Sequence, residues 1–327
     1  MAIDILKIEP TTISRDLKEK FILIYSAPKS GKTTFASRIP KNLLLASERG
    51  YNAISGLKAV DITKWSEFKT VVSQLRKEES KEMYDTITLD TVTIFYELCE
   101  AYICARHNVD SISEISWGRG YSETKEEFAN VLRQITMLGY GLIMIAHSER
   151  RIEKSEERGE VEYISPAMNK RAYEIVNQLA DIIGYIEVEF NSDGSTQRWL
   201  YTRRTPTIMA GSRFPHLAAK IPFGNTGYEE LTAALSEAIE KSEQEGAVLV
   251  DTHFSEESLE LAKGRPFEEL KEEARQEWER ILTLGDEKIS DLQNIIKDIF
   301  GRAVKLSQIT PKQQDLFELV LKEMKKL

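Results

Sequence analysis

Residues 26–33 carry side-chain types that can bind a polyphosphate. They read Ser-Ala-Pro-Lys-Ser-Gly-Lys-Thr, follow the apolar run at residues 21–25 and precede a helical pattern at residues 34–38. A strand, a loop ending in Gly-Lys-Thr and a helix form the order of a P-loop. In such a loop, backbone N–H groups surround the phosphates, the lysine neutralises the β- and γ-phosphates, the threonine hydroxyl holds Mg²⁺, and the helix adds its positive N-terminal end. The pattern predicts a site for ATP and Mg²⁺ formed by Ser26, Ala27, Pro28, Lys29, Ser30, Gly31, Lys32, Thr33 and Thr34.

Ser26 is the one departure from this motif, which opens with glycine. Glycine tolerates a positive φ at a tight turn and serine tolerates it poorly. The departure therefore bears on whether the backbone can form the tight turn at this position. The alternative interpretation is a surface turn before an ordinary helix. The strand before the loop and the helix after it favour phosphate binding, with Lys32 also contributing its charge to catalysis.

Asp90 is the predicted second ligand of Mg²⁺. It ends the apolar run Thr-Ile-Thr-Leu-Asp at residues 86–90, and an aspartate at the end of a strand adjacent to the P-loop is a typical magnesium carboxylate. Asp90 also precedes a helical pattern, so a role as helix N-cap is the alternative. The two roles are compatible, and Thr33 and Asp90 are the predicted metal ligands.

Glu48 and His147 are two further polar residues at the ends of predicted strands. Hydrolysis needs a group that orients or deprotonates water in line with the γ-phosphate, and Glu48 can do so if its strand adjoins the P-loop. The alternative for Glu48 is a surface position before the turn at Gly50. His147 is placed to contact the γ-phosphate and signal its presence to the next loop, or to be only a hydrogen-bonded polar residue.

Three arginines, Arg203, Arg204 and Arg213, follow a predicted hairpin. An arginine from a neighbouring subunit can stabilise the charge that develops in phosphoryl transfer, and Arg213 is our candidate for this catalytic role. Exposed arginines on the edge of a sheet are the alternative.

Two segments contain side chains suited to single-stranded DNA. Residues 117–121 read Trp-Gly-Arg-Gly-Tyr, and aromatic rings beside arginine can stack on bases of any sequence. The alternative is that Trp117 or Tyr121 anchors its loop to the core. The second segment is the polar stretch 148–171, which ends in Asn-Lys-Arg and whose basic residues are nearly matched by acidic ones.

Elements that position these residues alternate along the first half of the chain. We expect strands at residues 21–25, 43–46, 86–90 and 141–147, and helices at residues 33–38, 64–77, 93–107 and 122–138. The strands are continuous apolar runs, which is typical of a sheet covered on both faces. The alternation predicts an α/β fold with a mostly parallel sheet.

Beyond residue 147 the pattern changes. Residues 148–163 are predicted to be a mobile loop, which is either simply solvated or becomes ordered on a ligand. A helix at residues 169–180 and a hairpin of residues 182–190 and 198–203 are expected to follow. Helices are then expected at residues 228–244, 256–263, 266–283, 288–300 and 311–326. We place a domain boundary near residue 245, which gives an ATPase domain at residues 1–245 and an acidic helical extension at residues 246–327.

Composition limits the class of protein. The chain has 327 residues, of which 41% are hydrophobic and 30% charged. Its net charge is −9, and all of this excess lies in residues 229–327, which carry 23 acidic and 14 basic residues. No global basic field draws nucleic acid to the chain, so DNA binding would depend on local loops or on an assembly.

No leader or membrane span is expected. The first residues lack a basic region followed by an apolar core, and no apolar stretch reaches the ~20 residues that span a bilayer. Cys99 and Cys104 are five residues apart in a helical pattern, which favours neither a disulfide nor a metal pair and indicates core filling. These points predict a cytoplasmic protein.

The order of these features resembles the RecA-like ATPase core. More narrowly, it is similar to the phage nucleotide-binding family of short RecA-like recombination ATPases, the Sak-four type. The resemblance covers residues 20–225 and depends on the P-loop, the strand-end residues Glu48, Asp90 and His147, the polar stretch after His147 and the hairpin with its arginines.

The resemblance implies roles for these residues. Lys32 and Thr33 would bind phosphate and Mg²⁺, Asp90 would be the second metal carboxylate, and Glu48 would activate water. His147 would take the sensor position, where the RecA group more often has glutamine.

The resemblance also implies partners. Residues 107–121 and 148–168 would correspond in order to the two DNA-contacting loops of the RecA core. Such proteins bind single-stranded DNA, anneal or pair strands, cooperate with a single-strand DNA-binding protein, and assemble as rings or filaments with ATP between subunits. The sequence thus predicts an ATP-hydrolysing recombination or annealing protein, in the host cytoplasm if phage-encoded.

Two other functions stay open. One is a helicase loader or replicative motor built on the same core. The other is a nucleotide-switched scaffold that recruits a protein through its C-terminal helices.

Overall fold

The computed structural model describes residues 13–14, 17–155, 159–224, 227–250 and 267–327. The chain divides into two compact units, residues 1–262 and residues 263–327. The division falls later than the expected boundary near residue 245. The reason is that β12 (Leu249–Val250) pairs in parallel with β1 (Ile13–Ser14), which ties this segment to the first unit.

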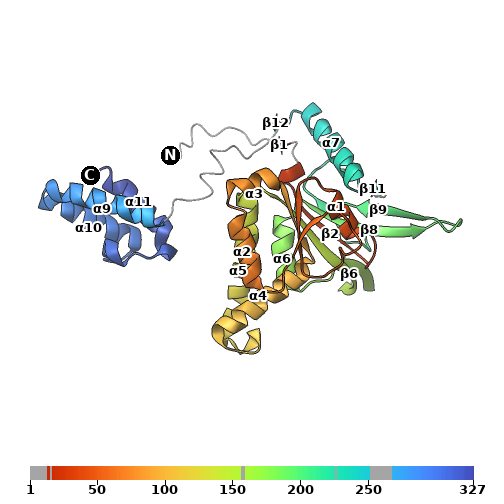
Figure 1. Ribbon diagram of the computed structural model, residues 1–327, viewed down its shortest axis with the longest axis horizontal. Coiled ribbons are helices and arrows are strands. Elements are labelled where there is room, and N and C mark those ends of the chain that lie inside the picture. The colour runs from red at the N-terminus through yellow and green to blue at the C-terminus, as the bar shows by residue number, and fades with distance from the viewer. Residues whose placement is uncertain (1–12, 15–16, 156–158, 225–226, 251–266) are drawn as a thin grey trace. The chain divides into compact units, whose positions relative to one another are not determined.

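A single large sheet forms the centre of the first unit (Figure 1). Its central strands pair in parallel, so the expected α/β fold with a mostly parallel sheet is confirmed. Two strands at one side, β9 and β11, run antiparallel to their neighbours, and β10 (Gly211–Ser212) pairs antiparallel with β8. The order across the sheet is β11 (Lys220–Pro222), β9 (Thr196–Tyr201), β8 (Ile182–Phe190), β2 (Phe21–Ser26), β6 (Gly141–Ser155), β5 (Thr86–Asp90), β3 (Asn42–Ala46) and β4 (Lys58–Asp61).

The strand order differs from the adjacency that we expected. One strand, β6, lies between β2 and the strand that ends at Asp90, and both β6 and β5 lie between β2 and β3. Glu48 therefore does not follow a neighbour of the phosphate-loop strand. Because parallel strands end at the same edge of the sheet, the strand-end residues still lie along one edge.

Helices cover both faces of this sheet, which explains why its strands are apolar throughout. One face packs on α1 (Lys32–Arg38) and α7 (Tyr228–Gln244), through residues such as Ile24 and Phe35. The opposite face packs on the helices α2 (Trp65–Gln74), α4 (Val92–His107), α5 (Arg119–Met137) and α6 (Lys170–Leu179) (Figure 1). A short helix, α3 (Glu78–Met83), precedes β5. Cys99 is buried in α4 and Cys104 is half-buried, and both are free thiols.

Residues 148–163 are not the loop that we expected. β6 continues to Ser155 and pairs antiparallel with β7 (Gly159–Pro166), so most of this segment is a hairpin. Its Ile152 is 63% exposed. The polar sequence reflects this exposure rather than missing structure. The hairpin predicted at residues 182–190 and 198–203 is confirmed, because β8 and β9 pair antiparallel.

The second unit is helical, as expected. It consists of α9 (Phe267–Thr283), α10 (Asp286–Phe300) and α11 (Gln314–Met324), joined through short turns. Residues such as Leu270, Phe317 and Leu321 form its core. The helix expected at residues 256–263 lies outside the described residues.

The second unit is not acidic. Residues 263–327 contain 13 acidic and 13 basic residues, so the negative charge of the C-terminal third belongs to residues 229–262. In the part of the chain that the structure describes, every helix is too short or too polar to cross a lipid bilayer.

Candidate nucleotide-binding site

The phosphate loop connects the end of β2 to the start of α1. Ser26 is the last residue of β2 and is fully buried, so it occupies a strand position rather than a turn with positive φ. The left-handed backbone lies at Lys29, with φ 63°, and at Gly31, with φ 102°. The hydroxyls of Ser26 and Ser30 are hydrogen-bonded to each other. The departure at Ser26 is thus compatible with the loop, because the conformation that needs glycine falls on Gly31.

The Lys32 side chain lies across this loop. Its Nζ donates to the carbonyl oxygens of Ala27 at 2.9 Å and Ser26 at 3.1 Å, and the residue is 6% exposed. Burial lowers the pKa of Lys32 to about 8, although the carboxylates of Asp90 and Glu48 oppose the shift. A cation held at this position, with little water around it, has an electrostatic preference for a polyanion.

Thr33 and Asp90 meet directly. The Thr33 hydroxyl donates to Oδ2 of Asp90 at 2.7 Å. Asp90 is buried, and burial raises the pKa of its carboxyl, while the Thr33 hydrogen bond and Lys32 act in the opposite direction. The N-cap of α4 is Thr91 rather than Asp90. The Asp90 carboxylate is therefore directed at the phosphate loop, as the metal-ligand hypothesis requires.

The pair fits Mg²⁺ by its chemistry. A hydroxyl and a carboxylate are hard oxygen ligands, and Mg²⁺ is bound in such sites through one or two protein oxygens together with the phosphates. Thr33 and Asp90 would hold the ion, which would neutralise charge on the β- and γ-phosphates.

Ser47 fixes the backbone beside this pair. Its hydroxyl donates to the carbonyl oxygen of Asp90 at 3.1 Å and accepts from the backbone N–H of Thr91 at 2.9 Å. Its backbone N–H also donates to Asp90 at 2.8 Å. The chain leaving β3 is thus held against the end of β5, which carries Glu48 toward the phosphate loop.

Glu48 and His147 are brought together at this edge. The distance between Oε2 of Glu48 and Nε2 of His147 is 3.7 Å. Both side chains are partly exposed, and Nδ1 of His147 is buried without a hydrogen-bond partner among the described residues. His147 is the register partner of Ser26 at the end of β2. Both residues therefore lie beside the phosphate loop.

Arg198 is a site residue that sequence reasoning missed. It lies in β9 opposite Val188 of β8, and its guanidinium contacts Gly31, because a Cβ at Gly31 would collide with it. The residue is half-buried. No motif marks Arg198. The only signal available in the sequence is its place in a hairpin strand whose partner, β8, pairs with β2.

The arginine that we proposed for catalysis lies elsewhere. Arg213 forms an ion pair with Asp181 at 3.1 Å, and Asp181 accepts a hydrogen bond from the backbone of Phe21. Phe21 begins β2, so Arg213 lies at the edge of the sheet opposite the phosphate loop. Arg203 donates to the backbone carbonyls of Ser212, Phe214 and Pro215. Within this chain neither arginine belongs to the nucleotide site.

The aromatic segment at residues 117–121 forms a tip between α4 and α5. Trp117 is fully exposed and has a φ of 59°, so it does not anchor its loop to the core. Tyr121 is half-buried, and the Arg171 guanidinium lies 4.0 Å from the centre of its ring. Tyr121 and Arg171 border a hollow of about 500 Å³ whose lining also includes Lys125, Lys170 and Glu174.

A short chain of contacts connects the nucleotide site to this hollow. The carbonyl oxygen of His147 accepts from the backbone N–H of Ala167 at 2.7 Å. The carbonyl oxygen of Ala167 accepts from the Thr93 hydroxyl at 2.9 Å. Lys170 begins α6 three residues after Ala167. His147 and the cations of α6 are therefore linked through one ordered connection.

The strand order, the phosphate loop and the Thr33–Asp90 pair define a P-loop ATPase domain. A family model described as "AAA domain" (AAA_24) matches residues 18–214, and the chain belongs to this family. The match covers all residues of the nucleotide site and every strand of the large sheet except β11.

Relatives extend the comparison. The chain is 28% identical to the "SPbeta prophage-derived uncharacterized protein YorG" of Bacillus subtilis (strain 168), over 100% of this chain and 99% of that protein. Among solved structures, it is similar to a KaiC-like protein of Pyrococcus horikoshii OT3, with 12% identity, coverage of 64% of this chain and 88% of the other, and a TM-score of 0.35. The flagellar accessory protein FlaH of Methanocaldococcus jannaschii gives 10% identity, coverage of 62% and 84%, and a TM-score of 0.33.

Proposed function

We propose that this protein is an ATP-dependent recombination or annealing protein of phage type that binds single-stranded DNA and hydrolyses ATP with Mg²⁺. The observation that carries the DNA part is the fully exposed Trp117 beside the stacked pair of Tyr121 and Arg171. The full-length similarity to a prophage-derived protein supports the phage setting.

Hydrolysis would depend on positioning and electrostatics, as phosphoryl transfer generally does. Lys32 would leave the loop carbonyls for the β- and γ-phosphates, because a polyanion attracts the cation more strongly than two carbonyl dipoles. Glu48 would orient the attacking water, and His147 would hold Glu48 through the 3.7 Å contact. Arg198, in contact with Gly31, would reach the phosphates from within the same chain.

DNA binding would use the tip and the first turn of α6. An exposed indole offers a stacking surface for any base, worth roughly 1–3 kcal/mol per stacked base. Lys125, Lys170 and Arg171 line the hollow beside it and would attract backbone phosphates. The described lining of this hollow includes one carboxylate, that of Glu174, so local charge rather than net charge would govern binding.

Nucleotide and DNA sites would be coupled through Ala167. A movement of His147 on γ-phosphate binding or loss would be passed by the His147–Ala167 hydrogen bond to the start of α6. A protein of this kind would act as a ring or filament of identical subunits, together with a single-strand DNA-binding protein. A nucleotide-switched scaffold, or a helicase-loader motor, is the competing function.

The test is steady-state ATP hydrolysis with and without a single-stranded oligonucleotide. We expect stimulation by DNA in the wild type, and loss of stimulation with unchanged basal hydrolysis in Trp117→Ala and in the double variant Lys170→Gln/Arg171→Gln. Phe190→Ala is the matched control, since Phe190 is also an exposed aromatic residue, 80% accessible, in the β8–β9 hairpin. Hydrolysis that is indifferent to DNA in the wild type would reject the recombination function and favour the scaffold.

A further inference from the structure

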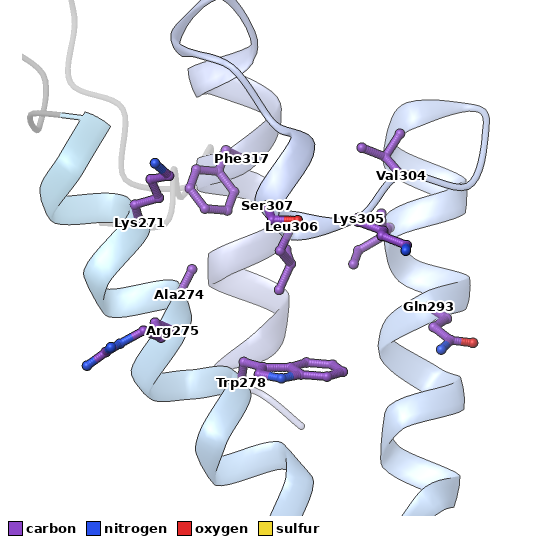
Figure 2. A pocket seen from close by; sticks show the side chains of 11 residues that line it. Lys271, Ala274, Arg275, Trp278, Gln293, Val304, Lys305, Leu306, Ser307 and Phe317 are labelled. Carbon is purple, nitrogen blue, oxygen red and sulfur yellow. The ribbon is translucent and has the colours of Figure 1, made fainter.

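A cavity of about 550 Å³ lies in the second unit, bounded by α9, α10, α11 and the segment at residues 304–307. Figure 2 shows the Trp278 ring projecting from α9 toward α10, with Phe317 and Leu306 on the side away from Gln293. A volume of this size accommodates one or two large side chains and the backbone between them. The cavity does not belong to the nucleotide site, which lies wholly in the first unit.

The floor of the cavity is continuous with the core of the unit. Ala274, Ile296 and Phe317 line it and are buried. The walls formed by Trp278, Val304 and Leu306 are apolar but only partly buried. Covering such walls would remove apolar surface from water, which stabilises a complex by roughly 25 cal/mol per Å². The apolar interior therefore fits an aromatic or aliphatic side chain.

The rim of the cavity is positively charged. Lys271, Arg275 and Lys305 line it, and the lining includes no carboxylate. This differs from the unit as a whole, in which acidic and basic residues are equal in number. Arg275 approaches Glu272 at 3.3 Å and Glu279 at 4.0 Å, and Lys271 approaches Glu268 at 3.8 Å. All three are exposed pairs about one helical turn apart, which contribute little.

Lys305 adds a cation at the opposite side of the rim. It is exposed, and it forms no ion pair with another described residue. Its backbone N–H donates to the side chain of Gln308 at the start of the turn Leu306–Gln308, which fixes the position of the Lys305 backbone. An occupant that presents carboxylates on both sides of an apolar anchor would match cations from α9 and from this turn.

We propose that this cavity is a docking site for an acidic peptide segment of a partner protein, in which an aromatic or aliphatic residue is flanked by aspartate or glutamate. The apolar residue would enter beside Trp278 and Phe317, and its acidic neighbours would face Arg275 and Lys305. The site serves to bring a second protein to the ATPase, and it is independent of the proposed DNA-binding tip in the first unit.

The experiment is selection of a displayed library of random 12-residue peptides against the full-length protein, followed by fluorescence anisotropy with the selected peptides. We expect enrichment of acidic residues around one aromatic or aliphatic residue. The double variant Arg275→Glu/Lys305→Glu should bind these peptides at least tenfold more weakly, and added salt should weaken wild-type binding. Both substituted residues are exposed, so the fold is retained, which circular dichroism would verify.

Lys322→Glu is the matched control. Lys322 is exposed on α11 of the same unit but does not line the cavity, so its reversal should leave peptide affinity unchanged. Selected peptides without acidic enrichment, or binding that the double variant retains, would overturn the proposal. So would concentration-dependent dimerisation in sedimentation velocity that only the double variant abolishes, because the occupant would then be a second copy of this chain.

Discussion

Glu48 and His147 lie 3.7 Å apart although β5 separates β3, which Glu48 follows, from β6, which contains His147. The cause is the bend after β3, where Ser47 is hydrogen-bonded to Asp90 at the end of β5. The bend carries Glu48 past the metal-ligand pair and toward His147. Residues from three strands are thus gathered without the strands being neighbours.

Glu48→Gln tests the role of this carboxylate. Removing its charge should lower ATP hydrolysis by about 10²–10⁴-fold, the usual contribution of a positioned base, while ATP binding is retained. The measurement is phosphate release beside equilibrium binding of a fluorescent ATP analogue. Glu79→Gln, an exposed glutamate in α3, is the control. Unchanged turnover in Glu48→Gln would exclude Glu48 as the water-orienting group.

Lys32→Ala tests the phosphate loop itself. Without the cation, the β- and γ-phosphates lose their closest neutralising charge, so we expect turnover to fall to the background level. Lys241→Ala, which removes an exposed lysine of α7 paired with Glu237, should have no effect on turnover. Undiminished hydrolysis in Lys32→Ala would contradict the assignment of this loop.

The affinity for ATP should depend on pH above pH 8. Burial lowers the pKa of Lys32 to about 8 in the free protein, so the amine becomes neutral as pH rises through this value. Phosphates favour the charged form and raise the pKa, which means that binding takes up a proton above pH 8. The dissociation constant should increase by up to tenfold per pH unit between pH 8 and 9.5. A titration series in this range measures it, and Lys32→Met should show no such slope.

Arg198→Ala tests the arginine that contacts the phosphate loop from β9. We expect weaker ATP binding and at least tenfold slower hydrolysis, since a hydrogen bond to a charged group such as phosphate contributes roughly 1.5–3 kcal/mol. Arg198→Lys should restore little, because the guanidinium can bind phosphate through two parallel N–H groups. Arg133→Ala, at an exposed site on α5, is the control. Wild-type kinetics in Arg198→Ala would show that the contact with Gly31 has no part in nucleotide binding.

The elements that could be predicted from the sequence are those with a strong local signal. The strand ending at Asp90 has the predicted bounds, and the phosphate loop connects a strand to a helix that begins at Lys32, as expected. Both the strand and the loop can be recognised from residues that are adjacent in the sequence. The strands with continuous apolar sequences are buried on both faces, so the sequence alone places them in the centre of the sheet.

The features that could not be predicted depend on distant pairing or on exposed strands. Residues 148–155 extend β6 while facing solvent, so no alternation of apolar residues indicates a strand. The edge strand Lys58–Asp61 was not predicted for the same reason, because it is short and mostly exposed and carries no apolar pattern. Arg198 reaches Gly31 only because β8 pairs with β2, and no sequence motif records that pairing.

The continuity of β6 has an evolutionary consequence. One uninterrupted strand pairs with β5 up to Ile145, with β2 up to His147 and with β7 from Ser148 onward, so the register of the core strands determines which way the hairpin side chains face. Because side chains alternate between faces, inserting one residue after His147 would turn every later side chain of the strand over. In related chains, insertions and deletions in this hairpin should therefore involve two residues at a time or lie at its far end. Insertions of a single residue beside His147 should be absent.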